Sequence, residues 1–259
     1  MHYNRGSYQS LALLAQGVSD TARAQVIGAD TVLNIYTWKW SQAGGRTTYT
    51  AQHVNTWARM MTRHLTIPHR LVCITDQPEG INCDTIPLPE WSPEVDNPHW
   101  PARKGVPQCY RRLDMYRRDA ALTYGDRFVS MDLDCIVTSN IDHLFDHDYD
   151  FRMFRGTSGK RPYNGSMMQM TAGARPQVFE RFTPELAVKA SSLYIGSDQA
   201  WIAYALGWLE RTWGVEHGVL SMGKKRGIHE LPKNHCLLFT PDKIKPWDVK
   251  SEIVREFYR

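Results

Sequence analysis

The sequence has no Cys-x-x-Cys pair, and its five cysteines are odd in number. Neither a disulfide framework nor a zinc site is therefore expected, and we predict reduced thiols in a cytoplasmic protein. No apolar run approaches the ~20 residues that cross a bilayer. The longest run near the N-terminus, Leu11 to Ala15, is too short for a signal-peptide core. We expect a soluble, unexported protein without a membrane span.

A strong charge of either sign is also missing. Thirty-one basic and 27 acidic residues leave a net charge of +4, which falls well short of a nucleic-acid-binding signature. Hydrophobic residues make up 42% of the chain and charged residues 22%, which is ordinary for a folded globular protein. A length of 259 residues suits one large α/β domain.

Strand patterns alternate with helix patterns along the chain, which predicts an α/β fold with a central, mostly parallel sheet flanked by helices. We expect an N-terminal extension over 1–30, one domain over 31–248 and a C-terminal tail over 249–259. Residues 84–108 hold six prolines and two tryptophans without a clear period, which indicates a long surface loop. The predicted strands are 31–38, 70–75, 127–137, 151–154 and 166–170, and the predicted helices are 20–27, 51–65, 110–122, 142–145, 177–182 and 198–206.

Two carboxylates separated by one residue end an apolar strand, at Asp132 and Asp134. The two-residue period of a strand turns both side chains to the same side. Two buried like charges are costly unless a cation compensates them, and a hard divalent ion with oxygen ligands does so while leaving positions open for phosphate oxygens. The alternative is structural: one aspartate caps the following turn and the other is solvated.

The surrounding motifs resemble those of glycogenin and the other retaining glycosyltransferases of family 8, which have a GT-A fold. The stretch FVSMDLDCIVTSNIDHLF, from Phe128 to Phe145, is similar to the metal-binding strand and following helix of that family. The segments 112–116, 163–168 and 197–199 resemble its donor-contacting helix, its Phe-Asn-Ser-Gly-Val-Met strand with Gly and Ser exchanged, and its Asp-Gln helix start. The resemblance covers about residues 31–248 and extends to uncharacterised bacterial and phage proteins related to these enzymes.

The resemblance implies that the two aspartates hold Mn²⁺, or Mg²⁺, against the diphosphate of a sugar nucleotide. The family usually has a third ligand, a histidine shortly before Lys-Pro-Trp. Lys245, Pro246 and Trp247 fit, but Thr240 and Pro241 stand where the family has His and Gly, and His235 lies ten residues before Lys245. Either the ion has two side-chain ligands plus diphosphate and water, or His235 reaches it through a rearranged loop.

Further roles follow from the same resemblance. The implied donor-binding residues are Tyr36, Thr37, Trp38, Asp76, Arg112, Asp132, Asn164 and Lys245, with Arg117 as the alternative to Arg112. Asp198 would bond hydroxyls of the donor sugar, and Gln199 would lie by the reacting face. Each has a structural alternative: an N-cap for Asp198, a turn for Asn164, a surface lysine for Lys245 and core packing for the aromatic residues. Likewise, the loop from Trp91 to Trp100 forms either a stacking platform or a set of buried hydrophobes.

The predicted activity is transfer of a sugar from a nucleotide-diphosphate sugar to an acceptor hydroxyl, with retention of configuration implied by the resemblance. The acceptor is a saccharide or, as an alternative, a hydroxymethylated base in phage DNA. A second alternative is a non-catalytic sugar-nucleotide binding protein. A third is a phosphatase of the haloacid-dehalogenase type, in which Asp132 would be the nucleophile and Asp134 the acid/base.

Overall fold

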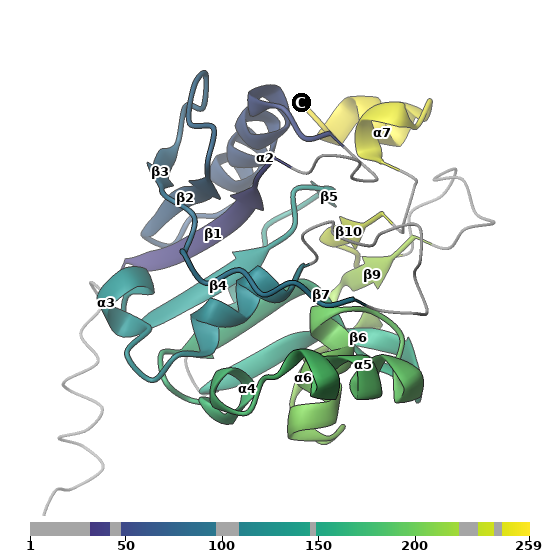
Figure 1. Cartoon of the computed structure of the whole chain (residues 1–259). Coiled ribbons are helices and arrows are strands. Elements are labelled where there is room, and N and C mark those ends of the chain that lie inside the picture. The colour runs from purple at the N-terminus through teal and green to yellow at the C-terminus, as the bar shows by residue number, and fades with distance from the viewer. Residues whose placement is uncertain (1–31, 42–47, 97–108, 146–148, 223–232, 241–244) are drawn as a thin grey trace, which may run out of the picture. The chain divides into compact units, whose positions relative to one another are not determined.

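A seven-stranded sheet organises the described residues (Figure 1), with the strand order β3-β2-β1-β4-β7-β6-β8. Neighbouring strands run parallel from β3 to β4 and between β6 and β8, whereas β7 is antiparallel to β4 and β6. The predicted α/β fold with a mostly parallel central sheet is therefore confirmed. The strands are β1 (Leu33–Lys39), β2 (His69–Thr75), β3 (Asp84–Ile86), β4 (Arg127–Met131), β6 (Phe151–Ser158), β7 (Arg161–Thr171) and β8 (Thr212–Trp213).

The computed structural model describes residues 32–41, 48–96, 109–145, 149–222, 233–240 and 245–259. The predicted N-terminal extension with its helix over 20–27, most of the loop after β1, and residues 97–108 of the predicted long loop lie outside these ranges. Within that loop the structure adds the short strand β3, which extends the parallel part of the sheet by pairing with β2.

A second, three-stranded sheet has the order β5-β10-β9, formed by β5 (Cys135–Val137), β10 (Leu237–Phe239) and β9 (Val219–Ser221). The prediction of one continuous strand over 127–137 was wrong, because the chain leaves the large sheet after Met131. There the amide of Asp132 donates to the carbonyl of Ser166, and the chain next pairs with β10. The two aspartates thus lie in a link between two sheets.

Helices cover both faces of the large sheet. On one face lie α2 (Ala51–His64) and the three-stranded sheet, and Ile35 of β1 packs there with Trp57 of α2. Tyr36, the next residue of β1, faces the other side and packs with Tyr110. That side is covered by η2 (Cys109–Tyr116), α3 (Ala121–Tyr124), α4 (Gln177–Glu180), α5 (Pro184–Leu193) and α6 (Asp198–Leu206).

The predicted helix over 110–122 is replaced by η2, a turn and α3. Leu113, Asp114, Met115 and Tyr116 are all buried, and four consecutive buried residues cannot share one face of an α-helix. The helix α5 was missed although its start signal is present: Thr183 accepts a hydrogen bond from the Leu186 amide at 3.2 Å, with proline at the first helical position.

Short elements complete the described chain. These are η3 (Asp142–Leu144), η4 (Val215–His217), η5 (Pro246–Asp248) and α7 (Glu252–Phe257). The predicted short helix near 142–145 corresponds to η3, in which Asn140 accepts a hydrogen bond from the Asp142 amide at 3.0 Å. In the segment predicted as a tail, Val254 of α7 packs with Ile136 and Leu238 of the three-stranded sheet.

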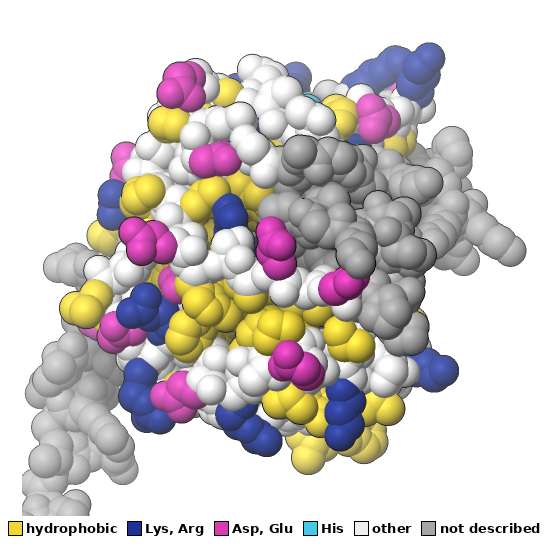
Figure 2. Space-filling view, in the orientation of Figure 1, with side chains coloured by type: hydrophobic (Ala, Val, Ile, Leu, Met, Phe, Trp, Pro, Cys, Tyr) yellow, Lys and Arg dark blue, Asp and Glu magenta, His cyan; other side chains and the backbone are white. Residues whose placement is uncertain are grey.

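Figure 2 shows one face of the molecule, on which acidic and basic side chains are interspersed and hydrophobic side chains show between them. Two large apolar side chains after α6 are strongly exposed: Trp208 at 73% and Leu209 at 87%. None of the helices formed by the described residues has the length and apolarity that crossing a membrane requires.

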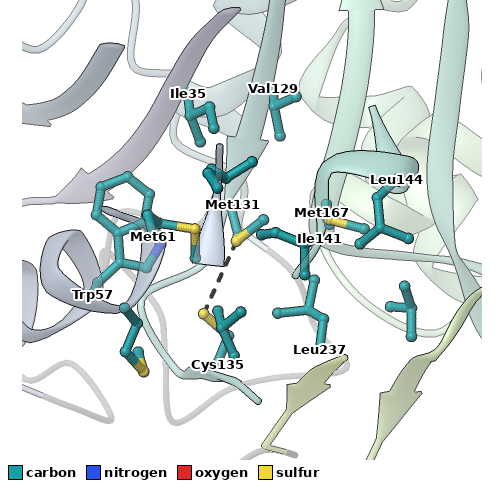
Figure 3. Packing of buried hydrophobic residues seen from close by; sticks show 14 of the residues in the cluster. Ile35, Trp57, Met61, Val129, Met131, Cys135, Ile141, Leu144, Met167 and Leu237 are labelled. Atoms are coloured by element: carbon teal, nitrogen blue, oxygen red, sulfur yellow. Dashed lines mark hydrogen bonds between the residues drawn. The ribbon is translucent and has the colours of Figure 1, made fainter. Parts of the chain in front are cut away.

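The core on the α2 side joins both sheets (Figure 3). Met131 ends β4 and Cys135 begins β5, and their sulfur atoms lie 4.0 Å apart. Both residues are almost fully buried, together with Trp57 and Leu237. Burying one such apolar side chain stabilises the fold by about 1.5–3 kcal/mol. The apolar residues on either side of the two aspartates therefore fix the position of the link that carries them.

Candidate active site

Charged side chains from four parts of the chain meet beyond the carboxyl end of β4. This is the edge at which parallel α/β sheets bind ligands. The link between β4 and β5 supplies Asp132 and Asp134, and antiparallel β7 runs beside the link because the Asp132 amide bonds to the Ser166 carbonyl at 2.8 Å. The other charged members are Arg112 from η2, Asp198 from the first turn of α6 and Lys245 just before η5.

Arg112 joins the first aspartate of the link to the start of α6. Its Nη1 donates to Oδ1 of Asp132 at 2.5 Å, and its Nε and Nη2 donate to Oδ2 of Asp198 at 3.0 and 2.6 Å. The side chains of Arg112 and Asp198 are only 12% and 8% exposed. Burial lowers the pKa of Arg112, but the charges of Asp198 and Asp132 outweigh it and hold that pKa well above its usual value. Arg112 is therefore a permanent cation between two carboxylates.

The second aspartate of the link lies deeper and is paired with Lys245. The Lys245 ammonium donates to Oδ2 of Asp134 and, at 3.2 Å, to the hydroxyl of Tyr49. The amide and the hydroxyl of Thr240 both donate to the backbone carbonyl of Asp134 at 3.1 Å. Burial and then the charge of Asp132 raise the pKa of the Asp134 carboxyl, while Lys245 opposes the shift. Asp134 is thus held in a nearly dry position with a protein cation as its partner.

Gln199 and Asn164 flank this centre on the side of β7. Oε1 of Gln199 accepts from the Gly165 amide at 3.2 Å, and its Nε2 donates to the Ile195 carbonyl at 2.8 Å. Oδ1 of Asn164, within β7, accepts from the Ser166 amide at 3.0 Å. Gln199 therefore ties β7 to the segment that precedes α6.

Gly165 allows β7 to approach the ion pairs closely. A Cβ at this position would lie 2.9 Å from Nη2 of Arg112 and 3.3 Å from Oδ2 of Asp198. The first distance is shorter than ordinary van der Waals contact, so a larger residue would push the guanidinium or the carboxylate away. The exchange of Gly and Ser in the segment 163–168 thus places the smallest residue against Arg112.

The donor set available to a divalent ion consists of two carboxylates. Magnesium is usually bound through one or two carboxylates plus substrate phosphates rather than by a cage of protein ligands. Asp132 keeps 29% of its side chain exposed and Asp134 keeps 11%. Within the described ranges, no group of three or more His, Cys, Asp or Glu side chains is arranged to hold a metal ion. The residues fit an ion shared with a diphosphate and do not form a closed protein site.

His235 is not brought to the carboxylate pair. β10 runs antiparallel to β5, with Phe239 opposite Cys135, so Thr240 lies beside Asp134. The carbonyl of His235 accepts from Oγ of Ser139 at 3.3 Å, beyond the other end of β5. Five residues of extended chain separate the two positions by about 16 Å, at roughly 3.3 Å per residue. Of the two alternatives for the third ligand, this geometry favours the one without His235.

Three predicted nucleotide contacts are core residues of β1: Tyr36, Thr37 and Trp38. The Tyr36 hydroxyl donates to the Tyr124 carbonyl at 3.1 Å, and Nε1 of Trp38 donates to Oγ of Ser130 at 3.2 Å. Thr37 is fully buried between its neighbours. The strand is covered on both faces, as is usual for parallel sheets, so these side chains pack in the core.

Two further predicted contact residues, Asp76 and Trp91, lie outside the strand β1. Asp76 is exposed at the end of β2, and both its carboxylate oxygens accept from the Ser41 amide, at 3.1 and 3.2 Å. Trp91 is partly buried and its ring lies 4.8 Å from that of Phe179, so it packs on α4 as one of the buried hydrophobes. Trp100, the other tryptophan of this loop, lies outside the described residues.

Sequence reasoning missed two residues that complete the Asp134 environment. Tyr49 bonds to Lys245 through its hydroxyl, and Thr240 bonds to the Asp134 backbone. Tyr49 lies just before α2, and no local pattern marks it. Thr240 was noticed only as a departure from the family pattern. The side chain and the amide of Thr240 both bond to the carbonyl of Asp134. These two residues are 106 positions apart in the sequence, and the pairing of β10 with β5 brings them together.

Comparison with known proteins gives a structural likeness only. No protein-family model matches the chain, and no curated protein matches it in sequence. Among solved structures, the galactosyltransferase LgtC in complex with donor and acceptor sugar analogues is similar with a TM-score of 0.55 and 11% identity, over 86% of this chain and 93% of that one. The glycosyltransferase GlyE of Streptococcus pneumoniae in its apo form is similar with a TM-score of 0.54 and 14% identity, over 88% of this chain and 60% of that one. The chain therefore has the fold of these glycosyltransferases.

Proposed function

We propose that this protein is a glycosyltransferase that moves a sugar from a nucleotide-diphosphate sugar to an acceptor hydroxyl. The observation that carries the proposal is the meeting of Asp132, Asp134, Asp198, Arg112 and Lys245 at the carboxyl edge of β4. The structural likeness to two glycosyltransferases supports it. Family 8 membership stays an inference from the sequence motifs.

The cations of the centre would contact the diphosphate, and Asp198 and Gln199 would contact the sugar. Arg112 and Lys245 are the cations that would stabilise negative charge on the departing nucleotide diphosphate. Asp198 is fixed by two hydrogen bonds from Arg112 to Oδ2, and its Oδ1, which accepts from the Ser197 hydroxyl at 3.4 Å, would also accept from hydroxyls of the donor sugar. Gln199 is held by Gly165 and Ile195 and would present its side-chain amide beside the reacting carbon.

Asp132 and Asp134 are the residues that would hold Mn²⁺ or Mg²⁺. When bound, such an ion supplies Lewis-acid stabilisation of the diphosphate leaving group. Asp132 would have to share its carboxylate between the ion and Arg112. Asp134 bonds to Lys245 through Oδ2, so an ion on this carboxylate would bring a second positive charge beside the ammonium.

Retention of configuration is part of the proposal. An inverting enzyme needs a carboxylate that is free to act as a general base towards the acceptor hydroxyl. All three carboxylates of the centre are paired with a cation: Asp132 and Asp198 with Arg112, and Asp134 with Lys245. A carboxylate that already accepts a hydrogen bond from a protein cation is not free to take the proton of an acceptor hydroxyl, which supports a mechanism without base-assisted inversion. The anomeric configuration of the product, measured by NMR, tests this part directly.

The phosphatase alternative needs Asp132 as nucleophile and Asp134 as proton donor and acceptor. Asp134 is 11% exposed and bonded to the Lys245 ammonium, so it cannot easily reach a leaving group. The DNA alternative calls for a strongly basic protein, and the net charge of this chain is only +4. We therefore propose a saccharide as the acceptor. Transfer that falls steeply with salt would favour DNA instead.

A thermal-shift panel of nucleotide sugars with and without Mn²⁺ tests the function. A ligand that binds only the folded state raises the melting temperature by mass action. We expect one nucleotide sugar to give a Mn²⁺-dependent shift that Asp132→Ala and Asp134→Ala each abolish. Asp119→Ala is the control, because Asp119 is exposed and forms an exposed ion pair with Arg117. Absence of a shift and of sugar transfer across the whole panel would contradict the proposal.

A further inference from the structure

The partner of Asp134 is a lysine that is itself almost completely buried. Lys245 is 4% exposed, and its ammonium donates to Asp134 and to the Tyr49 hydroxyl. Its charge also lies 5.6 Å from the centre of the Tyr49 ring, within the range of a cation–π contact. An ammonium in such a position is stable only with an anion beside it. Here that anion is Asp134.

The backbone that carries Lys245 is anchored, whereas its side chain is long and flexible. Two residues further on, the Trp247 ring stacks on His53 of α2 with centroids 3.8 Å apart and planes at 14°. The same ring meets Tyr49 edge-on at 5.8 Å. The four-carbon stem of lysine can therefore move its charge over several ångströms from a fixed base.

Asp134 is also one of the two carboxylates that fit a divalent ion. The ammonium already bonds to Oδ2 of Asp134, and an ammonium and a divalent ion on one carboxylate repel each other at short range, so they compete for this side chain. If an ion displaces the ammonium, Lys245 loses its counter-charge in a buried position. A diphosphate bound to the same ion brings negative charge to the place where the ammonium needs it.

We propose that the Lys245 ammonium pairs with the Asp134 carboxylate while no divalent ion is bound there. When ion and diphosphate bind together, the ammonium moves to pair with the diphosphate. The inference rests on the proposed function, because it assumes a nucleoside diphosphate as ligand. It makes Lys245 the residue that keeps the ion from binding alone. Ion binding and diphosphate binding are then coupled, each strengthening the other by the same factor.

The test measures two affinities in variants of Lys245. Mn²⁺ binding without nucleotide is followed by the electron paramagnetic resonance signal of the free ion. Binding of uridine and guanosine diphosphate at saturating Mn²⁺ is followed by calorimetry. The variants are Lys245→Met, which removes the charge, and Lys245→Gln, which keeps a hydrogen-bond donor if the first fails to fold. The matched control is Lys250→Met, because Lys250 is an exposed lysine five residues away.

We expect loss of the ammonium to change the two affinities in opposite directions. Mn²⁺ alone should bind at least about tenfold more tightly, because its competitor for Asp134 is gone. The diphosphate should bind about tenfold more weakly at saturating Mn²⁺, which is the size of one charge-assisted hydrogen bond. The control should match the wild-type protein in both. A purely structural role of Lys245 would weaken both affinities together.

Two failures are distinguishable. If the wild-type protein binds a diphosphate but Mn²⁺ alone binds the Lys245 variants no more tightly, the exchange of partners is refuted while the proposed function stands. If the wild-type protein binds neither diphosphate with Mn²⁺ and transfers no sugar, the proposed function is refuted and the inference with it.

Discussion

Replacing Arg112 by methionine tests whether the guanidinium holds the centre together. The substitution keeps an apolar side chain of related length and removes the charge between Asp132 and Asp198. Because Arg112 and Asp198 are 12% and 8% exposed, the low value of surface salt bridges does not apply to them. Removing one partner of a buried pair costs about 3–5 kcal/mol. Asp132 is 29% exposed, so water screens part of its loss. We therefore expect the free energy of unfolding to fall by about 3–5 kcal/mol.

Urea denaturation of four proteins measures this loss: the wild type, Arg112→Met, Asp198→Asn and the double variant. The double variant leaves no uncompensated charge at position 198, so it should lose less than the sum of the single losses by more than about 1 kcal/mol. Arg118→Met is the control, since Arg118 and Glu180 form an ion pair that is 72% and 43% exposed, and it should unfold like the wild type. A loss below about 1 kcal/mol for Arg112→Met, or strictly additive losses, would refute the assignment of Arg112 as a buried bridge.

Three further outcomes follow from single positions. Gly165→Ala should lower the free energy of unfolding by about 1–3 kcal/mol and weaken donor binding, because its Cβ would lie 2.9 Å from Nη2 of Arg112; urea denaturation and calorimetry measure the two effects. Burial, and then the charge of Arg152, lower the pKa of His217, so its contribution to stability is complete above the unfolded value of about 6.5 and is lost as the pH falls. His217→Gln should therefore lose less stability than the wild type between pH 7 and pH 5, and an equal loss would contradict the burial effect. Trp208→Ser should change the free energy of unfolding by no more than about 0.5 kcal/mol in urea, because that ring is 73% exposed.

The local hydrophobic pattern of the sequence was sufficient to predict the helices and strands whose apolar residues all pack in one part of the core. Val54, Trp57 and Met61 recur at helical spacing and are all buried on one face of α2, which matches the predicted helix. The buried strands β1 and β2 and the helix α6 also lie where hydrophobic pattern predicts them. The pattern failed at η2, where consecutive residues are buried, and at β5, where the apolar residues after the aspartates belong to another sheet.

The candidate site was predictable where charged residues stand among apolar ones. Asp132 and Asp134 stand among apolar residues, whereas Arg112 and Asp198 were found through the family resemblance, and the structure brings all four together around the link. The position of the lysine at 245 was found only through the Lys-Pro-Trp motif. In contrast, the positions of Thr240 and His235 depend on long-range pairing between β5 and β10, and that of Tyr49 on its distant contact with Lys245; neither leaves a trace in local sequence.

The charges of the centre affect whether an ion and a diphosphate can bind separately or only together. Three carboxylates face two protein cations, so the balance is 2 − 3 = −1 when all five groups are charged. A diphosphate arriving alone would meet this negative charge. A divalent ion arriving alone would have to displace Lys245 from Asp134 into a buried position with no anion. Arrival of both together removes each obstacle, because the ion compensates Asp132 and Asp134 while the diphosphate compensates the ammonium. On the proposed function, we therefore expect the centre to bind a metal-bound diphosphate more tightly than either component alone.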